Sequence, residues 1–132
     1  MGDLKTGKGL ISSDSGVLKE TQYSFGSRFE SGIGTNPEEL IAAAHAGCFS
    51  MALSAELGGV GIKPEKVATA AAVTLEKVET GFAITQVHLA VTVTSHGSDP
   101  AVLEAAAGRA KVNCPVSKVL NAKVSMEAKF ET

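Results

Sequence analysis

The two cysteines of this 132-residue chain, Cys48 and Cys114, are the residues best suited to chemistry. Two cysteines in a chain without an export signal serve redox or metal chemistry more often than structural crosslinking. A reactive cysteine must reach the thiolate, which requires a cation, a helix N-terminus or a metal nearby. Cys114 precedes Pro115 in a segment that predicts a helix N-terminus, whereas Cys48 lies within an apolar, alanine-rich segment. Local position therefore favours Cys114 as the more acidic thiol, and the alternative is that both are inert core residues.

Arg28 and Glu38 are the charged residues with a possible role beside a thiol. Arg28 lies between Phe25 and Phe29 in an otherwise uncharged segment. Inside a fold it would have to meet a carboxylate or a thiolate, and otherwise it is a solvated arginine whose stem covers the two rings. Glu38, in the first turn of a predicted helix, is by default a residue that complements the helix dipole.

His45 precedes Cys48 by three residues and shares its helical face. It could serve as a base for the thiol or as a metal ligand beside it. A zinc site would need further ligands, with Cys114 and His96 or His88 as the candidates. Because no close Cys/His spacing supports a metal, we expect none, and we interpret His45 as a packed or interface histidine.

The composition excludes several classes of function. The net charge is −2 and the basic residues are not clustered, so no nucleic-acid partner is expected. The N-terminal residues lack the apolar core of a signal peptide, and no uncharged apolar run is long enough to span a bilayer. We therefore expect a cytoplasmic protein that acts without a membrane. Its length predicts a single domain over residues 1–132.

The N-terminal third predicts a small meander followed by a long helix. Strands are expected near Gly9–Ser13 and Gly16–Tyr23, followed by an irregular stretch to Gly34. Thr35 or Asn36 can cap the helix, and Pro37 suits its first turn. The helix should end at about Leu57, before a Gly-Gly pair, and it is apolar nearly all round, which predicts burial on several sides.

The remaining elements predict an α+β domain with an antiparallel-rich sheet. Strands Val67–Val78 and Phe82–Thr94 form a hairpin, and a change of parity predicts a bulge near Thr85–Gln86. A helix is expected from Pro100 to about Val112, with Asn113 breaking it, then a short helix from Pro115 to about Leu120. The last strand alternates from Val124 to Phe130.

Four segments together resemble the OsmC/Ohr family, the osmotically inducible protein C and organic hydroperoxide resistance proteins. They are Arg28–Glu30, Gly34–Leu53, Gly81–Ile84 and Cys114–Ser117. An Asn-Pro-Glu helix start with a cysteine ten residues later, and a distant Cys-Pro, is a specific combination. In this chain Arg28 closely precedes the Asn-Pro-Glu helix start, and this arrangement resembles the OsmC branch of the family.

The resemblance implies a thiol peroxidase that acts in oxidative or osmotic stress. It reduces organic hydroperoxides, and hydrogen peroxide more weakly. Cys48 matches the peroxidatic cysteine and Cys114 the resolving one, with a disulfide between them. Arg28 matches the arginine that stabilises the thiolate, and Glu38 the glutamate that holds this arginine. No cofactor is implied, and the reductant is a dithiol such as a lipoylated protein.

The family fold is an intertwined homodimer with buried central helices flanked by sheets and active sites at the interface. The helical rise supports a shared site, because Glu38 and Cys48 are ten residues, or about 15 Å, apart along one helix. The apolar residues Phe25, Phe29, Phe49 and Met51 could line a pocket that favours organic peroxides. Two alternatives remain: a non-catalytic OsmC-like dimer that binds a small apolar ligand, and a metal-dependent protein using His45, Cys48 and Cys114.

Overall fold

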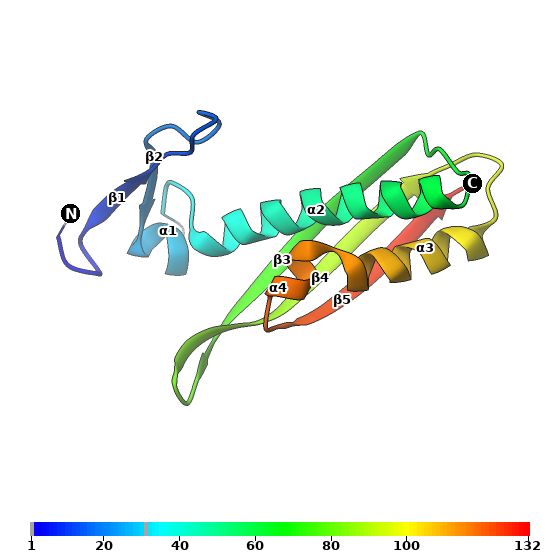
Figure 1. Ribbon diagram of the computed structural model, residues 1–132. Coiled ribbons are helices and arrows are strands. Elements are labelled where there is room, and N and C mark those ends of the chain that lie inside the picture. The colour runs from blue at the N-terminus through cyan, green and yellow to red at the C-terminus, as the bar shows by residue number, and fades with distance from the viewer. Residues whose placement is uncertain (1, 31) are drawn as a thin grey trace. The chain divides into compact units, whose positions relative to one another are not determined.

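The computed structural model describes residues 2–30 and 32–132, which form two compact units, Met1–Leu40 and Ile41–Thr132 (Figure 1). We call them the N-terminal and the C-terminal unit. The elements in chain order are β1 (Lys8–Ile11), β2 (Thr21–Ser24), α1 (Phe25–Phe29), α2 (Pro37–Gly59), β3 (Lys66–Val78), β4 (Gly81–Thr94), α3 (Pro100–Asn113), α4 (Pro115–Val119) and β5 (Lys123–Glu131). The prediction of a single domain over residues 1–132 stays a prediction.

The N-terminal unit contains an antiparallel pair of short strands, β1 and β2, and the one-turn helix α1. The prediction of an irregular stretch up to Gly34 is wrong for Phe25–Phe29, which form helix α1. Ser24 caps this helix: its side chain accepts a hydrogen bond from the Ser27 backbone, and the Ser27 hydroxyl accepts one from the Ser24 backbone. This reciprocal capping box lies within a Gly/Ser-rich segment that has too little periodicity to predict a helix.

Gly34 makes the turn that leads into α2. Its φ is +116°, and a Cβ there would lie 2.3 Å from the carbonyl oxygen of Gln22. A residue with a side chain would be strained in this conformation and would collide with the β2 backbone. The next residue, Thr35, donates its N–H to the same carbonyl oxygen at 2.9 Å. The turn therefore fixes the start of α2 against β2.

The C-terminal unit contains a three-stranded sheet in the order β3-β4-β5. Strands β3 and β4 form the predicted antiparallel hairpin, and β5 runs parallel to β4. The predicted bulge is confirmed, because Thr74 pairs with Gln86 while Leu75 pairs with Ile84, which leaves Thr85 without an opposite residue. The extra residue restores the alternation that places the β4 valines and Leu89 on one face.

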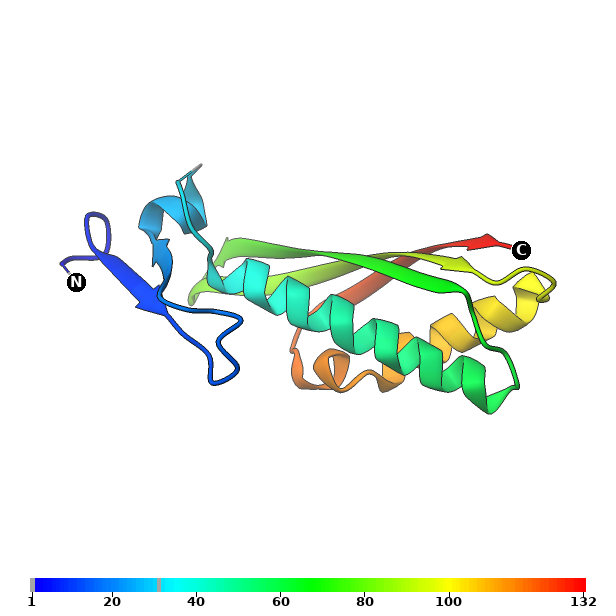
Figure 2. The same cartoon turned by 90° about the horizontal axis from the view of Figure 1, so that it is seen from above.

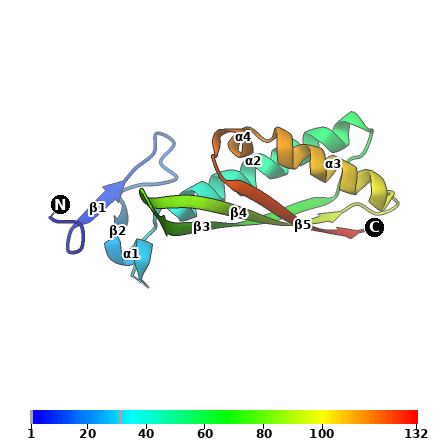
Figure 3. The same cartoon turned by 90° about the horizontal axis from the view of Figure 1, so that it is seen from below.

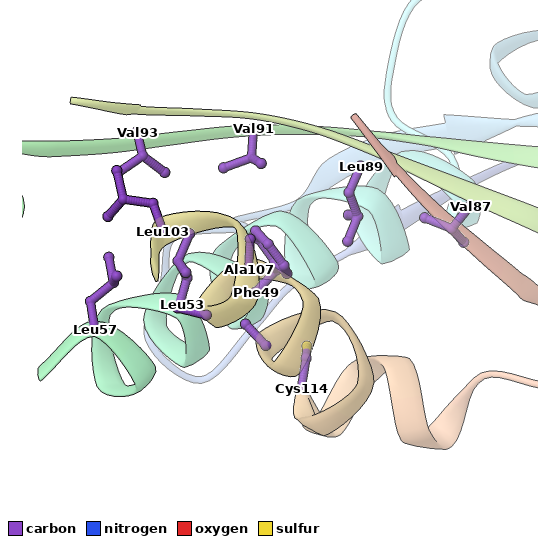
Figure 4. Close-up of a cluster of buried hydrophobic side chains, with 12 residues drawn as sticks. Phe49, Leu53, Leu57, Val87, Leu89, Val91, Val93, Leu103, Ala107 and Cys114 are labelled. Carbon is purple, nitrogen blue, oxygen red and sulfur yellow. The ribbon is translucent and has the colours of Figure 1, made fainter. Parts of the chain in front are cut away.

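The apolar core of the C-terminal unit lies between the sheet and helices α2 and α3. Figure 2 and Figure 3 show these helices on one face of the sheet. The core residues come from α2, β4, α3 and the start of α4 (Figure 4): Phe49, Leu53, Leu57, Val87, Leu89, Val91, Val93, Leu103, Ala106, Ala107, Ala110 and Cys114. Small alanines on α3 and large side chains on α2 and β4 fill this space together.

Helix α2 runs two residues beyond its expected end, because Gly58 and Gly59 are part of it. It is long and apolar enough to cross a membrane by length and composition, a test that the core helix of a water-soluble protein also passes. Only 22% of its apolar window is buried in this chain. The helix therefore carries apolar surface that the chain itself leaves open.

Candidate active site

Arg28 and Glu38 form an ion pair within the N-terminal unit. Arg28 Nε donates to Glu38 Oε1 at 2.7 Å, and the guanidinium also lies over the Phe29 ring, 5.3 Å from its centre. The Glu38 side chain is 11% exposed and that of Arg28 is 36% exposed. The second carboxylate oxygen, Oε2, is buried and has no hydrogen-bond partner within the described part of the chain. A buried carboxylate oxygen of this kind calls for a further donor.

A set of short-range hydrogen bonds holds this pair in register. The Asn36 amide donates to the Ser27 carbonyl at 2.9 Å, and Asn36 Oδ1 accepts from the Glu39 N–H at 2.8 Å, which confirms Asn36 as a cap of α2. The Ser27 hydroxyl donates to the Thr35 carbonyl at 2.7 Å. The helix α1 that carries Arg28 is thereby tied to the first turn of α2, where Glu38 lies.

The two cysteines meet within the C-terminal unit. Both thiols are free, and their Sγ atoms lie 3.1 Å apart, within hydrogen-bond distance of each other. Cys48 is half-buried on α2, and Cys114 is fully buried at the junction of α3 and α4. Because a disulfide bond is about 2.05 Å long, the sulfur atoms need to approach by only about 1 Å to form one.

The pKa values of the two thiols are shifted in opposite directions. Burial raises the pKa of Cys48, and the hydrogen bond with Cys114 adds to the rise. For Cys114, burial alone raises the pKa, but hydrogen bonds from Cys48 and from Ser117 outweigh it and the pKa is lowered. The structure thus agrees with the local-position argument that Cys114 is the more acidic thiol in one chain. Cys48 needs a cation from elsewhere to become the thiolate.

His45 and Ser117 are a second pair beside the cysteines, and sequence reasoning missed the serine. His45 Nε2 lies 2.8 Å from Ser117 Oγ, and the histidine is fully buried. Burial lowers the pKa of His45 and so favours the neutral ring. The only sequence signal for Ser117 is its position three residues after Cys114, matching the spacing from His45 to Cys48. The full burial of His45 and its contact with Ser117 confirm the interpretation of His45 as a packed histidine.

An apolar cleft of about 240 Å³ lies in the N-terminal unit, and Arg28 is among its lining residues. Phe25 and Phe29 line it as expected, with ring centres 4.8 Å apart. The expectation for Phe49 is wrong, because its side chain is fully buried in the core of the C-terminal unit. Met51, which is largely exposed on α2, belongs to neither the cleft nor the core.

The structure brings the four predicted site residues together as two pairs, Arg28 with Glu38 and Cys48 with Cys114. The geometry also bears on the metal alternative. Within residues 2–30 and 32–132, no group of three His, Cys, Asp or Glu side chains could hold a metal ion. His45 Nε2 lies within hydrogen-bond distance of Ser117 Oγ.

The fold and the paired thiols define a two-cysteine α+β protein, and comparisons with known proteins agree. Residues 30–129 match the family described as OsmC-like protein. The chain is 48% identical over 131 residues to a protein named Peroxiredoxin OsmC from Escherichia coli strain K12, covering 99% of this chain and 92% of the relative. The chain belongs to the OsmC family.

Solved structures support the same assignment. The organic hydroperoxide resistance protein OhrB of Bacillus subtilis is similar with a TM-score of 0.73 and 29% identity, over 98% of this chain and 93% of that one. An organic hydroperoxide resistance protein from Elizabethkingia anophelis has a TM-score of 0.71 and 26% identity, over 98% and 99% of the two chains. The mixed α+β fold with an antiparallel-rich sheet is thus the fold of these proteins.

Proposed function

We propose that this chain is a thiol-dependent peroxidase that reduces organic hydroperoxides, and hydrogen peroxide more weakly, through a sulfenic acid on Cys48 and a Cys48–Cys114 disulfide. The enzyme is of the peroxiredoxin type, as the name of its 48% identical relative indicates. The observation that carries the proposal is the 3.1 Å separation of two free thiols. Two thiols so close are poised to exchange between dithiol and disulfide states.

In the first step, the Cys48 thiolate attacks the terminal oxygen of the peroxide. The O–O bond breaks, the alcohol or water leaves, and Cys48 becomes a sulfenic acid. Cys114 then attacks the Cys48 sulfur, which forms the disulfide and releases water. An external dithiol reduces this disulfide by exchange and restores both thiols.

Arg28 stabilises the Cys48 thiolate and orients the peroxide, while Glu38 orients Arg28. Burial raises the pKa of Cys48, so a cation at this sulfur is required. Glu38 and Cys48 are ten residues apart on α2, about 15 Å along the helix axis, so one helix cannot bring them together. We therefore assign Arg28 and Glu38 of one chain to Cys48 of a second chain in a homodimer.

The apolar surface of α2 supports the same assembly. An apolar helix with little burial in its own chain is stabilised when a second copy covers it. The cleft lined by Phe25, Phe29 and Arg28 would place the apolar part of an organic hydroperoxide beside the cationic group. Cytoplasmic action with a dithiol reductant, such as a lipoylated protein, completes the proposal.

The test combines turnover with trapping. Cys48→Ser should abolish peroxide reduction, because a hydroxyl is not ionised near neutral pH and cannot form a sulfenic acid. Cys114→Ser should perform one turnover and leave a trappable sulfenic acid on Cys48. Mass spectrometry after one equivalent of an organic hydroperoxide reads both outcomes.

Each competing class gives a different result. A non-catalytic ligand-binding dimer would show no turnover with any dithiol. A metal-dependent protein would lose its activity when metal is removed, and metal analysis of the purified protein would detect the ion. Sulfenic acid on Cys114 in an active Cys48→Ser variant would reverse the assignment of the two cysteines.

A further inference from the structure

Two helices approach each other near the cysteines through two contacts with matched spacing. His45 and Cys48 are three residues apart on α2, and Cys114 and Ser117 are three residues apart where α4 begins. The cross-helix contacts are 3.1 Å between the cysteine sulfurs and 2.8 Å between His45 Nε2 and Ser117 Oγ. Residues three apart on a helix lie on one face, so the two pairs are neighbours.

The tautomer of His45 follows from the surroundings of its other nitrogen. Nδ1 is buried and has no hydrogen-bond partner within residues 2–30 and 32–132. A buried N–H without an acceptor is among the rarest defects in proteins. The ring is therefore stabilised with its proton on Nε2, from which it donates to Ser117 Oγ.

The direction of this hydrogen bond frees the hydroxyl proton of Ser117. A hydroxyl has one donor and two acceptor positions. When Ser117 Oγ accepts from His45, its own O–H is available for Cys114 Sγ, and the Ser117 side chain is among the groups that lower the pKa of Cys114. Donated to the sulfur three residues earlier on the same side of α4, this proton would complete a directed chain from the imidazole through the hydroxyl to Cys114.

We propose that His45 is a positioning residue for the resolving cysteine: through the Ser117 hydroxyl it stabilises the Cys114 thiolate and so accelerates disulfide formation. The inference rests on the roles proposed above for Cys48 and Cys114. The Cys114 thiolate attacks the sulfur of the Cys48 sulfenic acid, the S–S bond forms and the S–O bond breaks. The departing hydroxide takes a proton from solvent to become water. The two cysteines are thus served by separate groups: Arg28 acts on Cys48, and His45 with Ser117 acts on Cys114.

Neighbouring titratable and charged groups also affect the pKa of Cys114. Cys48 and His45 on α2 are titratable groups at this end of α4, while Lys111 and Lys118 lie in the last turns of α3 and α4. Replacing Cys48 with alanine removes the coupled thiol and leaves Cys114 as the single cysteine. All titrations are therefore made in the Cys48→Ala background, with thiolate absorbance measured against pH.

In that background, His45→Leu and Ser117→Ala should each raise the pKa of Cys114 by about one unit, the effect of losing a hydrogen bond to a charged group. The double variant should match either single variant, because His45 acts through Ser117. His45→Gln should restore most of the shift, since the amide N–H of glutamine can take the place of Nε2–H. Additive effects in the double variant, or an unchanged pKa in Ser117→Ala, would overturn the proposal.

The chain offers a matched control in His88 and Ser125, whose Nδ1 and Oγ atoms are 2.8 Å apart across β4 and β5. Ser125→Ala should leave the titration of Cys114 unchanged. If His45→Leu fails to fold, Ser117→Ala and His45→Gln still decide the outcome. An equal shift in Ser125→Ala would show a general loss of stability and would refute the specific role.

Single-turnover kinetics in the chain with both cysteines supply the second measurement. Ser117→Ala should form the Cys48 sulfenic acid at an unchanged rate and convert it to the disulfide roughly tenfold more slowly near neutral pH. If no sulfenic acid forms even in the unmodified chain, the proposed function fails, while the Cys114 titration still tests the hydrogen-bond chain. A slower first step with an unchanged second step would contradict this inference alone.

Discussion

The two units of this chain are stabilised by different kinds of interaction. In the described part of the N-terminal unit, the buried residues are all polar or charged: Ser27, Thr35 and Glu38. The C-terminal unit instead buries twelve apolar residues in one cluster, with His45 and Ser95 as its buried polar residues. Hydrogen bonds and turns hold the structure of the N-terminal unit, and apolar packing holds that of the C-terminal unit.

This difference matches the chemistry assigned to each unit. A cation can be presented to a substrate only if it stays partly exposed, and the Arg28 side chain is 36% exposed on a hydrogen-bonded support. Two thiols can form a disulfide reliably only if both are held rigidly, and Cys114 is part of the apolar core. A unit of about 40 residues without an apolar core is not expected to be stable alone, so it needs another surface against which to pack.

The largest expected effect comes from placing one defect in each unit. Glu38→Ala disables the N-terminal unit and Cys48→Ser disables the C-terminal unit, so each homodimer should be nearly inactive. After the two chains are refolded together, about half of the dimers are mixed and each has one intact site, so roughly a quarter of the activity should return.

The matched control for this mixing experiment mixes chains that carry only Glu38→Ala with chains that carry only Arg28→Ala. Both defects then lie in the N-terminal unit, so no site in a mixed dimer is intact and activity should not return. If the first mixture also stays inactive, each site is built from one chain. A monomer by sedimentation at micromolar concentration would refute the shared site independently.

Arg28→Ala should slow the reaction of Cys48 with peroxide by about 10²-fold, the typical effect of losing one group that stabilises charge in the transition state. The pKa of Cys48 should rise further, because the proposed cation is gone. Arg28→Lys should restore only part of the rate, since lysine lacks the planar fork that meets a carboxylate and a thiolate together. Stopped-flow kinetics and thiolate absorbance are the measurements.

Arg109 provides the control for this arginine, because its Nε also donates to a glutamate, Glu56, at 2.8 Å. Arg109→Ala removes a similar ion pair from the C-terminal unit and should have little effect on stability, because exposed ion pairs are screened by solvent. It should leave the titration of Cys48 unchanged. An unchanged titration in Arg28→Ala as well would mean that Arg28 has only a structural role.

Stability should also distinguish the two units. Leu103→Ala in the core of the C-terminal unit should lower the free energy of unfolding by about 2–5 kcal/mol, because it leaves a cavity in the apolar cluster. Leu10→Ala in β1 removes a side chain that is 62% exposed and should change the free energy by about 0.5 kcal/mol or less. Urea denaturation measures both, and equal losses would contradict the comparison.

The smallest effect concerns pH and the buried histidine of the C-terminal unit. Burial lowers the pKa of His45 below its ordinary value of 6.5. As the pH falls below that value, the unfolded chain gains a proton at His45 that the folded chain does not. The free energy of unfolding should therefore fall by up to about 1.4 kcal/mol per pH unit, until the pH reaches the lower pKa of the folded state.

His45→Gln should remove this part of the pH dependence, because glutamine does not titrate. His88→Gln, on β4, is the control for a general effect of losing a histidine. Urea denaturation curves collected from pH 7 to about pH 5 make the comparison. A pH dependence that is the same in His45→Gln and in the unmodified chain would show that His45 is not the group responsible.

Much of the secondary structure could be predicted because the signals are local. The hairpin of β3 and β4, the Asn36 cap of α2 and the bulge at Thr85 follow from turn residues, capping chemistry and a change of parity. The helix α1 could not be predicted, because its capping box lies in a segment without periodicity. The prediction that Phe49 lines the pocket was wrong, because the sequence of a helix that is apolar nearly all round does not show which face meets the core.

By itself the sequence determined which residues could do chemistry, the two thiols and the Arg28–Glu38 candidates, and the order of helices and strands. Only the tertiary structure decided which of them meet. The approach of Cys48 to Cys114 and of His45 to Ser117 depends on how α2 packs against the junction of α3 and α4. The two cysteines are separated by 66 positions in the sequence, and His45 and Ser117 by 72. Such contacts depend on packing of the whole core, because local propensity does not determine how distant helices dock.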